Sequence, residues 1–79
     1  SEKINISFTL TRHSFINVSV YDSKGTRLAE LVNEERPEGH NEFSWNGMGE
    51  NNHKLDPGVY FLRIVGQGKV HIAKVMLAD

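Results

Sequence analysis

The stretch NEFSWNG, residues 41–47, carries the clearest structural signal in the chain. Phe43 and Trp45 alternate with the polar residues Glu42 and Ser44, and a period of two sends successive side chains to opposite faces of a β-strand. The Asn-Gly pair that follows favours a turn. An inward-facing Trp can fill the space between two stacked sheets, so we predict that Trp45 seals the core of a two-layer β protein.

The same alternation continues on both sides of this stretch. We expect further strands over residues 4–10, 16–21, 27–32, 53–55, 59–65 and 70–77, each bounded by turn residues. The segment 27–32 is ambiguous, because Leu28, Leu31 and Val32 have helical spacing. It is too short for an independent helix, so we expect an irregular or bulged strand, followed by a charged loop from Asn33 to Gly39.

Seven short strands with turn signals at intervals of about 8 to 12 residues, and no convincing helix, are typical of a sandwich or small barrel. We predict one domain over residues 1–79, with an all-β, seven-stranded, antiparallel immunoglobulin-like β-sandwich fold. Tyr60 follows a Pro-Gly turn, and its hydroxyl is expected to reach back to a loop carbonyl as in a tyrosine corner. The predicted structural core consists of Phe8, Val18, Val20, Phe43, Trp45, Tyr60, Leu62 and Ile64.

Composition excludes several classes of function. Nine basic and ten acidic side chains leave a formal charge of −1, which gives no general attraction to phosphate backbones, so no nucleic-acid partner is expected. The longest apolar run, residues 59–62, is far below the ~20 residues that cross a bilayer, and we expect no membrane insertion. The chain has no cysteine, which excludes disulfides and thiol catalysis and is compatible with export.

No motif in the chain indicates an enzyme. The four histidines lack the paired spacing of a zinc site, and no serine has a nucleophile-elbow context, so we expect no catalytic residue, no cofactor and no metal. A core this thin also leaves little room for a walled pocket. Weak calcium binding by the loop 46–56 stays open beside an ordinary polar loop. The oxygen-bearing side chains of that loop are Asn46, Glu50, Asn51, Asn52 and Asp56.

The last two predicted strands have a second apolar face. If Tyr60, Leu62 and Ile64 point inward, the intervening residues point outward, interrupted only by Arg63 and Lys74. The predicted docking patch consists of Val59, Phe61, Val65, Val70, Ile72 and Met76. Isolated domains seldom expose large apolar patches, so this patch is expected to dock on another protein. The alternative is that the loop 33–40 folds over it, or that a bulge turns part of it inward.

Six blocks of sequence, taken in order, resemble a known family. The blocks are residues 20–25, 28–32, 37–40, 43–47, 56–61 and 74–77. In this order they are similar to the FlgD-like immunoglobulin-like module of the flagellar hook-capping protein and to the C-terminal sorting domains of the type IX (Por) secretion system. The chain departs from the pattern after Trp45, where Asn46 stands in place of the usual acidic residue and the following loop is not Asp-rich, which weakens any ion role there.

The resemblance implies a non-catalytic C-terminal accessory module of a secreted multidomain bacterial protein, at the cell surface or outside the cell. Its role would be sorting, export or surface tethering through protein–protein contact with the preceding domain of the parent protein and with export machinery. The isolated domain is expected to be monomeric. Two alternatives stay open: an accessory carbohydrate-binding module, with Tyr21 and Phe61 as the stacking aromatics, and a structural spacer attached to a secreted hydrolase.

Overall fold

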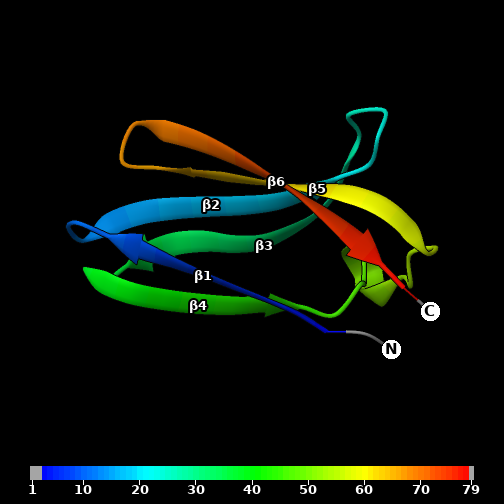
Figure 1. Ribbon diagram of the computed structural model, residues 1–79, viewed down its shortest axis with the longest axis horizontal. Helices are drawn as coiled ribbons and strands as arrows, with labels where there is room; N and C mark the ends of the chain where they lie inside the picture. Colours follow the sequence, from blue (N-terminus) through cyan, green and yellow to red (C-terminus); the bar gives the residue numbers. More distant parts are fainter. Residues whose placement is uncertain (1–2, 79) are drawn as a thin grey trace.

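The computed structural model describes residues 3–78, which form two antiparallel β-sheets (Figure 1). The smaller sheet pairs β1 (Ile4–Leu10) with β4 (Gly39–Trp45). The larger sheet has the strand order β3-β2-β5-β6. Its strands are β2 (Ser14–Tyr21), β3 (Arg27–Arg36), β5 (Gly58–Gly66) and β6 (Lys69–Leu77). Within residues 3–78 no helix has the length and hydropathy that a membrane span requires.

The described residues contain six strands, so the prediction of seven is wrong. The strand expected over residues 53–55 is replaced by a single bridge between Lys54 and Met48, after the short 3₁₀ helix η1 (Glu50–Asn52). Asn51 and Asn52 have φ of 62° and 57°, the left-handed region, which interrupts an extended chain. The backbone hydrogen bonds of this segment stay inside the loop, from Gly49 N–H to the His53 carbonyl and from Leu55 N–H to the Gly47 carbonyl. It is therefore a small local hairpin that joins neither sheet.

β3 is a bulged strand, as the sequence predicted, and it is longer than expected. Its register against β2 shifts twice, so that Leu31 and Leu28 are extra residues without a partner in β2. Each extra residue breaks the period of two, which is why the segment has helical spacing although it is extended. β3 also continues to Arg36, which corrects the prediction that a loop begins at Asn33.

The core lies between the sheets in two clusters of buried residues. Of the eight predicted core residues, five are buried: Val18, Val20, Trp45, Tyr60 and Leu62. The other three, Phe8, Phe43 and Ile64, are half-buried. They pack against one of the two clusters, which consists of Leu10, Ile16, Val18 and Val32. The rings of Phe8 and Phe43 meet edge to face. Both strands of the smaller sheet are edge strands, so their inward side chains have an open flank. Five further hydrophobic residues are buried that the sequence analysis left out: Leu10, Ile16, Ala29, Val32 and Leu77.

The start of β1 and the end of β6 lie at the same end of the sandwich as Trp45 (Figure 1). Ile4 pairs with Trp45 across the smaller sheet. A Cβ built on Gly47, just after β4, would lie 3.0 Å from Cδ1 of Leu77, the last residue of β6. The end of β6 is therefore anchored on the turn that follows β4.

Candidate docking surface

Trp45 and Tyr60 are interior anchors. The indole of Trp45 is 1 % exposed, its Nε1 donates a hydrogen bond to the Met48 carbonyl at 2.9 Å, and it meets the Tyr60 ring edge to face at 5.8 Å. The Tyr60 hydroxyl donates to the Asp56 carbonyl at 2.5 Å, which is the bond expected of a tyrosine corner. Buried rings of this kind stabilise the fold and leave no free face for a ligand to stack on.

The environment of Tyr60 also fixes its protonation. Burial raises the pKa of the Tyr60 hydroxyl above its usual value, and the nearby carboxylates of Asp56 and Asp22 raise it further. Both effects disfavour the phenolate. The hydroxyl therefore remains a donor to the Asp56 carbonyl at neutral pH.

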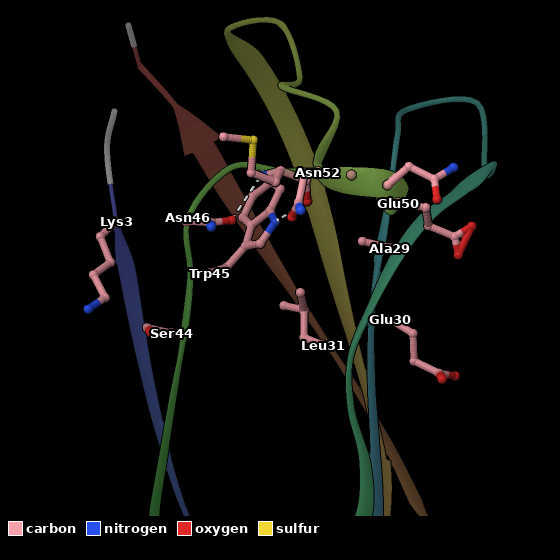
Figure 2. Close-up of a pocket in the computed structure, with 12 residues that line it drawn as sticks. Lys3, Ala29, Glu30, Leu31, Ser44, Trp45, Asn46, Glu50 and Asn52 are labelled. Atoms are coloured by element: carbon pink, nitrogen blue, oxygen red, sulfur yellow. Dashed lines mark hydrogen bonds between the residues drawn. The ribbon is translucent and has the colours of Figure 1, made fainter.

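A polar cleft of about 730 Å³ opens beside Trp45, between the end of β4, β3 and the loop that contains η1. Figure 2 shows the indole between β4 and β3, with Lys3 at one rim and Glu30 and Glu50 at the other. The Asn46 carboxamide accepts the Met48 N–H at 3.1 Å and so closes the turn against the indole. No group of three or more His, Asp or Glu side chains within residues 3–78 could hold a metal ion, here or elsewhere.

The outer face of the β5–β6 hairpin has the opposite character. The register pairs Val59 with Met76 and Val65 with Val70, so these apolar side chains share the face turned away from the core. Val70, Ile72 and Met76 are 54 %, 62 % and 67 % exposed. The remaining members of the predicted patch, Val59, Phe61 and Val65, are half-buried. All six predicted docking residues thus lie on one face of two adjacent strands.

The loop that was the alternative cover does not reach this face. Residues 33–36 belong to β3, at the opposite edge of the sheet from β6, with β2 and β5 between them. The register between β5 and β6 is continuous from Gly58 to Gly66, so no bulge turns part of the patch inward. The patch is therefore open.

The other half of the same outer face is polar. The Asn17 amide donates to the carboxylate of Glu30 at 3.0 Å and to the carboxamide oxygen of Asn33 at 3.2 Å. The Ser19 hydroxyl donates to Asn17 Oδ1 at 3.1 Å, and the Arg27 guanidinium lies 3.4 Å from Glu30 Oε2. The polar side chains over β2 and β3 thus hydrogen-bond to one another, whereas Val70, Ile72 and Met76 over β6 are exposed apolar side chains.

Sequence reasoning missed two features beside the patch. Phe15 is 53 % exposed at the start of β2, which begins two residues earlier than predicted; extending the alternation back from Asn17 would have found it. The second is a depression of about 400 Å³ where the β2–β3 turn stands against β5. Its lining includes Tyr21 and Asp22 from the turn side and Phe61, Arg63 and Ile72 from the hairpin. A contact between segments so far apart in sequence gives no local signal.

Comparisons with known proteins agree with this architecture. A model of the FlgD Ig-like domain family matches residues 1–69. The crystal structure of FLGD from P. aeruginosa is similar to this chain with a TM-score of 0.72 and 25 % sequence identity, over 96 % of this chain and 61 % of that one. The chain therefore spans about 61 % of the length of that matched structure. No curated protein matches the chain.

Proposed function

Because the chain belongs to the FlgD Ig-like domain family, we propose that it is a non-catalytic C-terminal accessory module of a secreted multidomain bacterial protein. In this role it sorts, exports or tethers the parent protein by protein–protein contact, as the resemblance to type IX sorting domains also suggests. The family is one of structural, non-catalytic domains, which is consistent with such a role. Its partners are the preceding domain of the parent protein and the export machinery, and its location is the cell surface or the medium.

One observation carries this proposal: the apolar outer face of β5–β6. Three large hydrophobic side chains there are more than half exposed in a chain whose core is thin. Contiguous exposed apolar surface is costly in water and marks interaction sites on soluble domains. The rest of the same sheet face is polar and internally hydrogen-bonded, so the apolar part is a bounded surface.

Carbohydrate binding is less well supported. Sugar rings stack on exposed aromatic faces, whereas Trp45 and Tyr60 are buried and Tyr21 and Phe61 are half-buried in the wall of the depression. Phe15 is 53 % exposed, but it is a single ring, with no second exposed aromatic among residues 3–78 to form a platform. A simple spacer does not require an exposed apolar face. Docking by protein–protein contact explains why this face is apolar and exposed, and it does not require exposed aromatic rings.

The test is an export assay in the bacterium that produces the parent protein. A reporter is fused ahead of residues 1–79, and the fraction of reporter outside the cell is measured for the natural chain and for Phe61→Ser/Ile72→Ser. We expect the natural chain to direct export and the double variant to lose most of it. The matched control Asn5→Ser/Thr9→Ser, at exposed positions of β1 on the other sheet, is expected to export normally.

The purified variants are compared by thermal unfolding to separate docking from folding. The proposal is supported if Phe61→Ser/Ile72→Ser stays folded and loses export. Normal export of the folded double variant, or unfolding caused by these surface substitutions, contradicts the assignment of this face.

A further inference from the structure

Two cations interrupt the apolar face of β5–β6, and neither has a partner. Arg63 lies opposite Ile72 in the register and Lys74 lies opposite Phe61, and both side chains are exposed. Within residues 3–78 neither forms an ion pair or a side-chain hydrogen bond. By contrast, Arg27 is paired with a carboxylate of β3. Positive charge on the apolar half of this face is therefore unbalanced.

The acidic groups nearest to this face are already engaged. The Glu30 carboxylate accepts hydrogen bonds from Asn17 and Arg27. The Asp22 carboxylate accepts the backbone N–H groups of Lys24 and Thr26 at 2.9 and 3.0 Å, and so shapes the β2–β3 turn. Asp22 keeps its negative charge, because its hydrogen-bond donors are neutral, but within residues 3–78 neither Asp22 nor Glu30 forms an ion pair with Arg63 or Lys74.

The depression of about 400 Å³ gives this face a place for one anchoring side chain. Tyr21, Phe61 and Ile72 line it with apolar surface, and the turn residues Asp22, Ser23 and Gly25 form its other wall. Arg63 also lines it, so a group that enters the depression comes close to a guanidinium. Interfaces are commonly held by an aromatic or aliphatic anchor in such a pocket, surrounded by polar contacts.

We propose that this face binds a polypeptide segment in which apolar residues alternate with carboxylates. This inference rests on the docking role proposed above and names the chemistry of the partner. The apolar anchor enters the depression against Phe61, and carboxylates pair with Arg63 and Lys74. An ion pair at the rim of an apolar contact is partly shielded from water, which strengthens it and fixes the register of the segment.

An anionic membrane fits this face less well. Surfaces that bind anionic lipid are rich in Lys and Arg, whereas two cations lie here beside Asp22 and Glu30, on a chain with a formal charge of −1. A local depression of about 400 Å³ is suited to a side chain rather than to an extended lipid surface. Binding to vesicles is accordingly one of the outcomes that the test must separate.

The experiment is a nuclear magnetic resonance titration of the ¹⁵N-labelled chain with two short peptides. In the first, Leu and Glu alternate around a central Phe; in the second, Lys replaces every Glu. We expect the acidic peptide to shift the amide signals of β5, β6 and Tyr21, with a Kd about tenfold lower than that of the basic peptide, as two ion pairs at the rim of the contact would give. Raising the salt concentration is expected to reduce this preference.

The variant Arg63→Gln/Lys74→Gln identifies the cations. It is expected to bind both peptides alike, whereas the matched control Lys3→Gln/Lys54→Gln, which removes the same charge from exposed positions outside this face, is expected to keep the tenfold preference. Equal binding of the two peptides to the natural chain, shifts confined to another face, or no shifts up to millimolar peptide overturns the inference. Binding to phosphatidylserine vesicles without binding to the acidic peptide, or self-association of the chain through this face in its place, overturns it as well.

This test and the export assay can fail separately. If Phe61→Ser/Ile72→Ser abolishes export while Arg63→Gln/Lys74→Gln leaves both export and peptide preference unchanged, the docking role stands and the acidic partner is wrong. If neither pair of substitutions affects export, the docking role itself is wrong.

Discussion

At the scale of single residues, the interior is organised around the contact between Trp45 and Tyr60. The two rings meet edge to face, and each polar atom donates to a loop carbonyl, Trp45 to Met48 and Tyr60 to Asp56. These two bonds tie the long β4–β5 connection to the core at both of its ends. The pair therefore stabilises the loop as well as the sheets.

We expect Trp45→Ala to lower the free energy of unfolding by about 3 to 5 kcal/mol, because it removes a large buried side chain and leaves a cavity. A domain of this size is stable by roughly 4 to 12 kcal/mol, so the variant should lose a large share of its stability and, at the low end of that range, all of it. Urea unfolding followed by circular dichroism measures the change. A loss of less than about 1 kcal/mol would show that the indole is not part of the core.

Stability is expected to fall at alkaline pH because of Tyr60. Its pKa in the folded chain is raised above the reference value of 10.0, chiefly by burial, so the unfolded chain gives up this proton at a lower pH than the folded chain. The stabilisation is complete below pH 10 and is lost as the pH rises through the raised pKa. Urea unfolding at pH 8 and at pH values above 10 should show this decrease.

The control for this effect is Tyr60→Phe, which lacks the titrating group. At neutral pH it should be about 0.5 to 1.5 kcal/mol less stable than the natural chain, because the bond to the Asp56 carbonyl is lost. Above pH 10 its stability should decrease less steeply than that of the natural chain. Parallel pH profiles for the two proteins would mean that Tyr60 titrates normally.

At the scale of secondary-structure elements, the turn after β4 positions the end of the chain. Gly47 has a φ of 82°, and a Cβ there would lie 3.0 Å from Leu77, so Gly47→Ala adds both backbone strain and a close contact. Gly25 is a matched control, because its φ is 88° and nothing lies within 4 Å of its Cβ position.

We expect Gly25→Ala to cost about 1 to 2 kcal/mol, the usual penalty for a left-handed residue with a Cβ, and Gly47→Ala to cost more. Thermal or urea unfolding of the two variants gives the comparison. Equal losses would show that the end of β6 does not pack against this turn.

The strands differ in how well their sequences predict them. The pairings of β1 with β4 and of β5 with β2 and β6 have no register shift, so in these strands the alternation seen in the sequence is the alternation in space. In β3 the two bulges insert Leu28 and Leu31 and destroy the period, so its length and its buried residues, Ala29 and Val32, could not be read from pattern alone. The strand predicted over residues 53–55 is wrong for another reason. Lys54 pairs with Met48 inside the same loop. A short extended pattern in the sequence does not distinguish such a loop hairpin from a strand that joins a sheet.

The same reasoning applies to the candidate surface. Strict alternation in β5 and β6 is enough to assign Val59, Phe61 and Ile72 to the outer face. The depression beside Tyr21 depends on how the β2–β3 turn stands against β5, which is a tertiary contact that no sequence period encodes. The role of the surface remains a prediction.

At the scale of the whole molecule, the larger sheet has two unlike halves on its outer side. The half over β2 and β3 forms its own hydrogen bonds, and the half over β5 and β6 exposes apolar side chains with unpaired cations between them. The inner side of the larger sheet contributes to the two buried clusters of the core, whereas the outer side of β5–β6 exposes Val70, Ile72 and Met76. Our account therefore requires that the outer face of β5–β6 is covered in the cell.

The two methionines allow this requirement to be measured directly, because Met76 is 67 % exposed on the outer face, while Met48 is half-buried and its carbonyl accepts the Trp45 indole N–H. Both are oxidised by hydrogen peroxide, in the purified chain and in cells that are exporting the parent protein, and the sulfoxide at each position is quantified by mass spectrometry. The account predicts that Met76 is oxidised faster than Met48 in the purified chain and becomes protected in cells, with Met48 unchanged. Equal oxidation of Met76 in both settings would show that nothing docks on this face.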